Sequence, residues 1–372
     1  MSPQFLHIAV TLAVLVLMCV LLVEFDAATP LATGRNVFAS PRPGQAVQRL
    51  IFLVDRCGMI GSAYMRAVQM NNSRLLQTHY QTSVVSYDAI NRHQYGLGDL
   101  VVFVKLHHRR SFARVVRHVQ AAGAFAIADV VDDWHSPIPP LVRLDAIIFS
   151  NRLHADYELY RGSINLDRRW IVPHHHSNFE HLVRTPAPDN LIKTIGTSSG
   201  PAQRMPPHYR RVVRMWARLH NIRFKEHEFV EVGSVLTRLR CDIMGTLAPR
   251  LNESVYKDNA HIHRRINDID VAIVVADGDE DALRFKPNTR MAMFHSHGIP
   301  VLSEPYQSYT EQYNASAAMY FTSPAELVQR LDWLRLHPAE LGQLRRAALQ
   351  NAHGYELEAI AQQYHTLFQK LN

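Results

Sequence analysis

Cationic and amide side chains gather in one short stretch of this sequence, Lys286-Pro287-Asn288-Thr289-Arg290, directly before an apolar segment with helical spacing. The first turn of a helix presents unpaired backbone N–H groups, so a helix that begins here favours an anion at its N-terminus. Lys286 and Arg290 add two positive charges, and a guanidinium can grip a phosphate with two parallel hydrogen bonds. Asn288 and Thr289 can cap the helix or contact phosphate oxygens. We expect a diphosphate site here; the alternative is an ordinary helix start whose cations face solvent.

Acidic and imidazole side chains follow other predicted strands. Asp129, Asp132, Asp133 and His135 come after an apolar run, and His175 lies in a run of three histidines after another. In open parallel sheets, ligands bind beyond the carboxyl ends of the strands. Carboxylates and imidazoles can accept a proton from a substrate hydroxyl, so Asp133, His135 and His175 are our candidate catalytic residues. The alternative is that they are helix caps and turn residues.

Two glycines, Gly58 and Gly196, also stand at predicted strand ends, where a missing side chain lets the backbone approach a ligand. We expect both near a bound substrate. The fingerprint G-x-G-x-x-G is absent at Gly58, which argues against an NAD-dependent dehydrogenase. Asp277-Gly278-Asp279 has the alternating carboxylates of a metal site, but it follows a complete α/β half, so we expect no metal.

These residues need a scaffold of alternating strands and helices, and the hydrophobic pattern supplies one. Short apolar runs separated by helical segments are typical of a parallel sheet covered on both faces. The predicted strands are 50–54, 83–87, 100–104, 125–129, 145–149, 169–173, 191–195, 269–275, 299–302 and 318–321. We therefore predict an α/β protein with two Rossmann-like, doubly wound domains facing a cleft.

A proline-rich break, RTPAPDN, divides the pattern into two halves. We place an N-terminal domain at 49–185 and a C-terminal domain at 186–345. The region 346–372 is predicted to be a helix that packs back on the body, because its apolar residues recur at helical spacing.

The segment 1–24 contains the uncharged apolar run Phe5–Val23, long enough to cross a bilayer as a helix. We predict a single-pass signal-anchor here, followed by a linker at 25–48 that is rich in Ala, Pro, Thr and Gly. A cleaved signal peptide is the alternative, although its apolar core is usually shorter and follows a basic stretch.

The orientation in the membrane rests on conflicting signals. Arg35 and Arg42, the nearest cations, follow the apolar run, and the positive-inside rule would then place the body in the cytosol. Glycosylation sequons at Asn71, Asn252 and Asn314 are usable only in the secretory lumen. We expect a body in the lumen of the Golgi or the endoplasmic reticulum.

The motif Lys-Pro-x-Thr-Arg at 286–290, the helix after it and Gly298-Ile299-Pro300-Val301 resemble the nucleotide-sugar-binding half of GT-B glycosyltransferases. A weaker resemblance extends over Leu50–Phe368. It implies that Glu304 and Tyr306 lie near the nucleoside of the donor, and that the N-terminal domain binds the acceptor. One position departs from the pattern: Met293 stands where many retaining members carry a glutamate that holds the donor ribose.

The resemblance implies a hexosyltransferase-like enzyme that moves a sugar from a nucleotide-diphosphate-sugar donor to a glycan or lipid-linked acceptor. No cofactor other than this donor is expected. The alternative is a catalytically inactive carbohydrate- or nucleotide-binding protein on the same fold. The net charge of +7 is spread over scattered residues, so we expect no nucleic-acid partner. The sequence leaves the oligomeric state open.

Overall fold

The computed structural model describes 48–55, 63, 65–87, 90, 93–131, 138, 143–160, 168–174, 190–199, 205–228, 266–275, 285, 287–312 and 317–371. The chain divides into two compact units, Met1–Gln45 and Ala46–Asn372. All described residues belong to the second unit, and every core outlined below is built from that unit alone.

The first sheet has six parallel strands in the order β2-β1-β3-β4-β5-β6. Their bounds are β1 Arg49–Val54, β2 Gln81–Ser86, β3 Leu100–Val104, β4 Phe125–Val131, β5 Ala146–Phe149 and β6 Arg169–Ile171. Side chains alternate across the sheet, so Leu50 and Phe52 enter one core while Ile51 and Leu53 enter the other. A sheet buried on both faces needs continuous apolar strands, and the sequence provides them.

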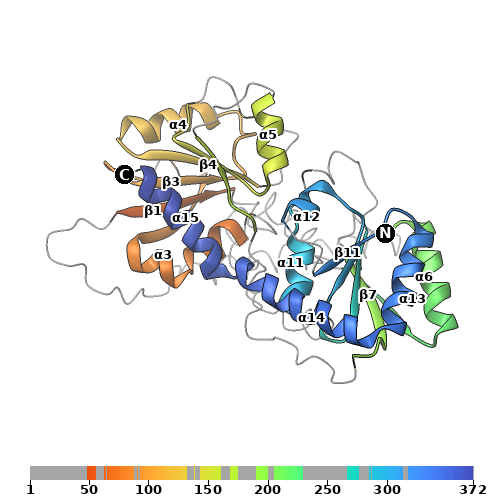
Figure 1. Ribbon diagram of the computed structural model, residues 1–372. Coiled ribbons are helices and arrows are strands. Elements are labelled where there is room, and N and C mark those ends of the chain that lie inside the picture. The colour runs from red at the N-terminus through yellow and green to blue at the C-terminus, as the bar shows by residue number, and fades with distance from the viewer. Residues whose placement is uncertain are drawn as a thin grey trace, which may run out of the picture. The chain divides into compact units, whose positions relative to one another are not determined.

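Helices cover both faces of this sheet. The π-helix η1 (Met65–Gln69) and α3 (Arg74–His79) lie on one face, while α4 (Phe112–Ala121) and α5 (Arg152–Tyr160) lie on the other. The last helix of the chain, α15 (Leu357–Leu371), packs beside α3 on the first of these faces (Figure 1). Its residues Ile360, Tyr364 and Phe368 are fully buried there.

The second sheet has five strands in the order β11-β10-β9-β7-β8, all paired in parallel. They are β7 Thr194–Ser199, β8 Arg223–Glu228, β9 Val271–Val274, β10 Val301–Ser303 and β11 Ala318–Tyr320. The helices of this part are α6 Pro207–Leu219, α11 Thr289–Ser296, α12 Gln307–Gln312, α13 Pro324–Leu336 and α14 Pro338–Ala352, followed by the 3-10 turn η5 His353–Tyr355. The prediction of an α/β protein with parallel sheets is confirmed.

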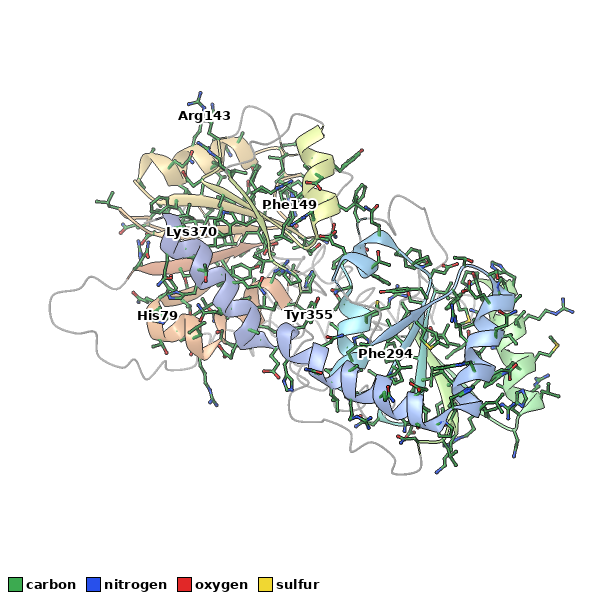
Figure 2. All side chains as sticks on the ribbon, viewed as in Figure 1. His79, Arg143, Phe149, Phe294, Tyr355 and Lys370 are labelled. Carbon is green, nitrogen blue, oxygen red and sulfur yellow. The ribbon has the colours of Figure 1, made fainter. Side chains whose placement is uncertain are left out.

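Each sheet has its own apolar cores. Phe149 of β5 lies in the core beneath α4 and α5, and Phe294 of α11 lies in the core between α11 and the second sheet (Figure 2). Both rings are fully buried. Burying a phenylalanine contributes roughly 1.5–3 kcal/mol, so these cores fix the strands whose ends carry the candidate site.

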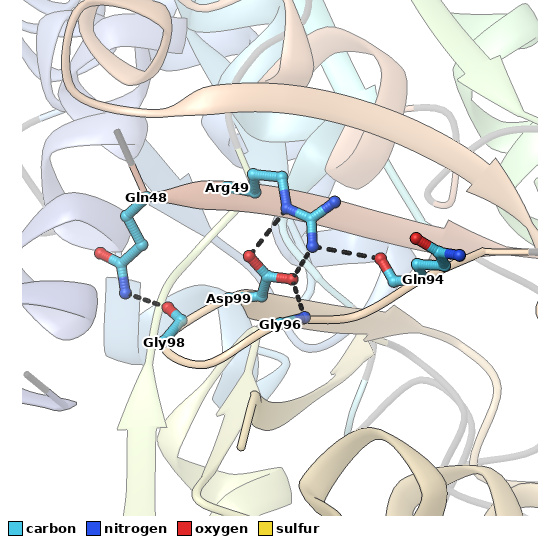
Figure 3. Close-up of polar contacts among 6 residues, drawn as sticks. All are labelled: Gln48, Arg49, Gln94, Gly96, Gly98 and Asp99. Atoms are coloured by element: carbon cyan, nitrogen blue, oxygen red, sulfur yellow. Dashed lines mark hydrogen bonds and ion pairs between the residues drawn. The ribbon is translucent and has the colours of Figure 1, made fainter. Parts of the chain in front are cut away.

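The amino ends of the first sheet are joined by a polar cluster (Figure 3). The Arg49 guanidinium forms a two-pronged ion pair with Asp99, with Nε 2.9 Å from Oδ1. Asp99 also accepts a hydrogen bond from the backbone N–H of Gly96 at 2.6 Å, and Arg49 donates to the Gln94 carbonyl at 3.1 Å. This cluster joins the start of β1 to the turn before β3, at the edge away from the strand ends that carry candidate site residues.

A fully buried polar cluster ties α15 to the first sheet. Arg66, Asp129 and Tyr364 are each 0% exposed. Arg66 donates to the Tyr364 hydroxyl at 3.0 Å and to the carbonyls of Val172 and Pro173, and Tyr364 donates to the Asp129 carboxylate. The Arg66 Nε lies 3.7 Å from Asp129 Oδ2. A buried charge is tolerated only when it is paired and hydrogen-bonded, and these contacts meet most of that need, although Arg66 Nε has no hydrogen-bond partner among the described residues.

A second polar contact of α15 yields a stability prediction. The carboxylate of Glu358 accepts from the Ser73 hydroxyl at 2.7 Å and from the backbone N–H groups of Arg74 at 2.9 Å and Leu75 at 3.1 Å. It therefore caps α3 and complements the positive end of that helix. We expect Glu358→Ala to lower the free energy of unfolding by about 1–2 kcal/mol, measured by urea denaturation.

The matched control for this prediction is Glu340→Ala, which removes a glutamate from the first turn of α14. We expect it to change the free energy of unfolding by less than about 0.5 kcal/mol. Equal losses in the two variants would show that Glu358 does not act as a cap.

Candidate functional site

The helix predicted after the Lys-Pro motif is present. Asn288 is the N-cap residue of α11, and Thr289 and Arg290 open its first turn, which contains no acidic residue. The backbone N–H groups of that turn and the Arg290 guanidinium make this helix end electropositive. Lys286 lies outside the described residues.

Asn288 is the most informative residue of this helix start. Its side chain is 0% exposed, and neither its amide oxygen nor its amide nitrogen has a hydrogen-bond partner in the part of the chain that the structure describes. It also makes no side-chain cap to α11. Leaving a buried polar group unsatisfied costs about 1–3 kcal/mol, so native proteins rarely do so without a reason. A ligand with both donor and acceptor groups would satisfy the whole amide, and a ligand with acceptors alone would satisfy its N–H groups.

Arg290 lies half-buried beside Tyr309 of α12. Burial raises the pKa of the Tyr309 hydroxyl, and the positive charge of Arg290 opposes that rise. Because the Arg290 side chain is itself half-buried, its charge is partly shielded from water at the start of α11. Charge–charge interactions are stronger there than in bulk water, which favours binding of an anion.

The carboxylate of Glu304 follows β10 and is held by two phenols. Tyr209, in the first turn of α6, donates a hydrogen bond to Glu304 Oε1 at 2.8 Å, and Tyr306 donates to Oε2. Burial is the main cause that raises the pKa of Tyr209, and Glu304 raises it further. The Tyr209 phenol therefore stays protonated, and the two hydroxyl groups orient the carboxylate at the carboxyl edge of the second sheet. Each carboxylate oxygen keeps a second lone pair for a ligand hydroxyl.

Sequence reasoning missed Tyr209. Its segment is predicted only as a helix start, because a single tyrosine in an amphipathic segment is usually a core residue. Its position in the first turn of a helix that follows β7 is a usable signal, since helix starts after parallel strands lie at the ligand-binding edge.

Two further side chains connect the start of α5 with distant segments; sequence reasoning did not single out Asn151, whereas the family resemblance implies that Glu311 lies near the donor nucleoside. Asn151 donates its side-chain N–H to the Phe285 carbonyl at 2.9 Å and accepts from the His154 backbone at 2.8 Å. Glu311 accepts from the backbone N–H groups of Arg152 at 2.7 Å and of Leu153 at 3.3 Å. The signal for Asn151 was present, because asparagine directly after a strand is a common N-cap.

The candidates on the first sheet stay predictions. Asp133, His135, His175 and Gly58 all lie outside the described residues. Asp129, which precedes them, is fully buried in the cluster with Arg66 and Tyr364, so its role in the structure is to stabilise the fold.

Gly196 lies within β7, and its surroundings give a packing reason for the glycine. A Cβ atom at this position would be 2.5 Å from Cδ1 of Ile269, closer than real Cβ contacts come. Glycine is thus required for β7 to pack against Ile269. Whether the backbone of Gly196 also approaches a donor stays a prediction.

Metal and membrane predictions fall largely on residues that the structure does not describe. Within the described ranges, no group of three or more His, Cys, Asp or Glu side chains is placed to hold a metal ion. Asp277 and Asp279 lie outside those ranges.

The membrane prediction also concerns residues that are not described. No helix in the described part is long and apolar enough to cross a membrane, and Phe5–Val23 lies outside that part.

The helix that carries the candidate site also contains a buried histidine with a pH consequence. Burial lowers the pKa of His295 to about 3, against an opposing hydrogen bond with the Ala317 backbone. When the pH is below 6.5, the ordinary pKa of histidine, His295 binds a proton in the unfolded chain but not in the folded chain. Folding stability should therefore fall as the pH drops from about 6.5 towards 3, by up to about 1.4 kcal/mol per pH unit.

Urea denaturation at several pH values between about 6.5 and 4.5 tests this expectation. The variant His295→Gln should show a shallower loss of stability with falling pH than the unmodified chain. His353→Gln is the control, because the His353 side chain is 74% exposed. If His295→Gln retains the full slope, another group is responsible for it.

The chain is similar to glycosyltransferases in two ways, in the sequence of its C-terminal part and in its fold. Residues 225–366 match the family model described as "Glycosyl transferase-like". No curated protein sequence matches the chain. A glycosyltransferase from Rickettsia africae has a similar structure, with 9% identity and a TM-score of 0.59 over 88% of this chain and 99% of that one. HepE of Anabaena in complex with UDP has 11% identity and a TM-score of 0.58 over 87% of this chain and 100% of that one. Sucrose-phosphate synthase of Thermosynechococcus elongatus has 10% identity and a TM-score of 0.57 over 87% of this chain and 99% of that one.

At such low identity the likeness shows the fold alone, and that fold is the one of GT-B glycosyltransferases. The family match is confined to the C-terminal part of the chain, where it includes α11, Glu304 and the helices after them.

Proposed function

We propose that this protein is a glycosyltransferase that moves a sugar from a nucleotide-diphosphate-sugar donor to a glycan or lipid-linked acceptor. The observation that carries the proposal is the fully buried, unsatisfied amide of Asn288 at the cationic start of α11. A diphosphate offers several acceptor oxygens, so it can satisfy the amide N–H groups and at the same time neutralise the helix end.

The residues of α11 would act on the leaving group. When the bond between the sugar and the diphosphate breaks, negative charge grows on the departing oxygen. The backbone N–H groups of the first turn, together with Arg290 and Lys286, would stabilise that charge, and Thr289 would position a phosphate oxygen. Such preorganised donors are the largest single contribution in many enzymes.

Glu304 is our candidate for binding the donor nucleoside. Tyr209 and Tyr306 hold its carboxylate with free lone pairs at the sheet edge, and two ribose hydroxyls are suitable donors to them. Met293, whose thioether cannot accept such bonds strongly, lies inside α11 and is 8% exposed. Glu304 would thus supply the ribose contact for which Met293 is unsuited. The Anabaena HepE complex with UDP and glucose shows that a protein of similar fold binds such ligands.

The acceptor hydroxyl needs a base if the reaction inverts the sugar configuration. Asp133, His135 and His175 are our candidates, with His175 also suited to contact a phosphate. Gly58 and Gly196 would let the backbone approach the substrates. We further propose that no divalent metal is required, because cationic residues already balance the diphosphate.

The N-terminal run Phe5–Val23 is proposed to anchor the protein as a single-pass helix. The body would lie in the lumen of the Golgi or endoplasmic reticulum, where the three sequons can be used. Treatment of the expressed protein with an endoglycosidase tests the orientation. A mobility shift supports a luminal body, whereas its absence together with cytosolic protease sensitivity contradicts it.

The alternative function is a catalytically inactive carbohydrate- or nucleotide-binding protein, which the methionine at position 293 favours. One experiment separates the two. The purified chain is screened against nucleotide-sugar donors for thermal stabilisation, and stabilising donors are then assayed for release of the nucleoside diphosphate with mixed glycan and lipid-linked acceptors. A donor that binds only the folded state must raise the melting temperature.

Stabilisation with acceptor-dependent release supports the enzyme. Stabilisation without release in any acceptor mixture supports the inactive binder. No shift with any donor at millimolar concentration contradicts both the enzyme and an inactive nucleotide binder, and leaves only an inactive carbohydrate binder.

A further inference from the structure

The outer face of α6 carries an unusual combination of side chains. Arg211, Arg214, Met215, Arg218 and Leu219 are all exposed and recur at helical spacing, and we refer to these five as the α6 outer face. Met215 is 64% exposed and Leu219 is 78% exposed. The opposite face of the helix, with Tyr209, Val213 and Trp216, is buried against the second sheet. Two large apolar side chains thus stand in water among three guanidinium groups.

The positive charge of this face is only partly compensated. Arg210 and Arg214 both form ion pairs with the same carboxylate, that of Glu226 on β8. Arg211 and Arg218 make no ion pair within the part of the chain that the structure describes. The segment Pro207–Leu219 contains no acidic residue. The helix therefore presents an excess of cations to any approaching partner.

An apolar groove runs beside these cations. Figure 1 shows α6 and α13 side by side. The groove is lined by Val212, Met215, Trp216, Leu219 and the stem of Arg218 from α6, and by Val328 from α13. A shallow hollow lined by the arginines of α6 adjoins it, and Met215 and Arg218 border both. The charged and the apolar parts are therefore continuous.

We propose that the α6 outer face docks on an anionic lipid bilayer. A bilayer surface combines phosphate groups with hydrocarbon a few ångströms deeper, which is the pattern that arginines flanking an apolar strip can match. A nucleic acid would pair with the cations but leave Leu219 and Met215 in water, and no exposed aromatic ring on this face could stack on a base. This sequence also contains an uncharged apolar run, Phe5–Val23, that suits a bilayer.

The proposal goes beyond the proposed function and does not depend on it. An inactive nucleotide-binding protein with the same helix would dock equally well. The docked helix would hold Tyr209, and with it the carboxylate of Glu304, in a fixed orientation to the membrane, because Tyr209 lies at the start of that helix and donates to the carboxylate.

The test uses residues 46–372, which form a compact unit with complete cores of their own and lack the apolar run at the N-terminus. Flotation compares phosphatidylcholine vesicles with vesicles in which about a third of the lipid is phosphatidylglycerol. We expect binding only to the anionic vesicles. Arg211→Gln with Arg218→Gln should weaken the partition coefficient about 25-fold, since each cation near such a surface contributes about fivefold.

The matched control is Arg114→Gln with Arg117→Gln, which removes two exposed arginines from α4. It should weaken binding less than about twofold, and melting curves must show that both double variants are folded. A third variant, Met215→Ser with Leu219→Ser, keeps every charge and should lower binding at least about tenfold through loss of apolar insertion.

Three results would overturn the proposal. The first is equal binding to neutral and anionic vesicles, and the second is an equal loss in the α4 control, which would show only a general effect of net charge. The third is no binding to either vesicle while single-stranded nucleic acid binds and the α6 arginine variant abolishes that binding.

Discussion

Arg290→Ala is expected to lower kcat/KM for sugar transfer by about 10²–10³-fold, the loss seen when one preorganised donor to a developing anion is removed. The reason is geometric. Arg290 belongs to the first turn of α11, two residues after the buried Asn288, and its own side chain is half-buried. Donor binding should weaken as well, so thermal stabilisation by a saturating donor should largely disappear. Steady-state kinetics and melting curves measure the two effects separately.

The control for this prediction is Arg117→Ala, an exposed arginine of α4 whose loss should leave kcat/KM within about twofold. Arg290→Lys keeps the charge and loses the two-pronged geometry, so it should recover only part of the activity. If Arg290→Ala transfers sugar as fast as the unmodified chain, the diphosphate does not bind at the start of α11.

Asp129→Ala is expected to destabilise the fold more than Glu358→Ala does, with a loss of about 3–5 kcal/mol. The substitution leaves the Arg66 charge buried without its carboxylate and deprives the Tyr364 hydroxyl of its acceptor. Burial is the main cause that raises the pKa of Tyr364 well above its usual value, and this burial persists in the variant, where it opposes ionisation of the phenol. Chemical denaturation followed by circular dichroism measures the loss.

A double-mutant cycle identifies the cause. Arg66→Met alone should also destabilise, because the carbonyls of Val172 and Pro173 lose their donor. The double variant Arg66→Met with Asp129→Ala should be clearly more stable than the sum of the two single losses predicts, by at least about 1 kcal/mol. Strict additivity would show that the ion pair does not couple the two side chains.

Most of the fold could be predicted from hydrophobic pattern, and the exceptions have physical reasons. The strand predicted at 100–104 agrees with β3 residue for residue, because a strand buried on both faces is apolar throughout. The edge strand β8, with the sequence RFKEHE, was missed. Its charges pair with neighbouring elements, Lys225 with Asp268 and Glu226 with Arg210, and charged edges of this kind protect a sheet from unwanted pairing.

Two other differences lie at segment ends and in helix type. The strand predicted at 191–195 is found as β7, Thr194–Ser199. Thr197 and Ser198 suggest a loop by their residue type, although both belong to the strand and Thr197 is buried. The spacing of Met, Ala and Leu over 59–76 predicts a single helix, whereas the described part of this segment holds the π-helix Met65–Gln69 and the start of α3. No simple spacing rule predicts a π-turn, since it depends on where buried Arg66 finds its partners.

The part of the candidate site that could be predicted from the sequence is the helix start after Lys286, because a single short motif supplies its side chains. Asn288, Thr289 and Arg290 lie at the helix start that the sequence predicted. Contacts over long sequence separations could not be predicted, such as Tyr209 with Glu304 and Asn151 with Phe285. Those pairs depend on how two distant segments are brought together by the sheet.

The packing of α15, the last helix of the chain, on the first sheet has a consequence for folding during synthesis. A ribosome releases the first sheet long before Leu357–Leu371, the helix that covers one face of it. At about 5–20 residues per second, the apolar face beneath α15 stays uncovered for on the order of tens of seconds. During that interval it is a natural target for chaperones, and a premature stop codon directly after η5 would leave it exposed for the lifetime of the polypeptide.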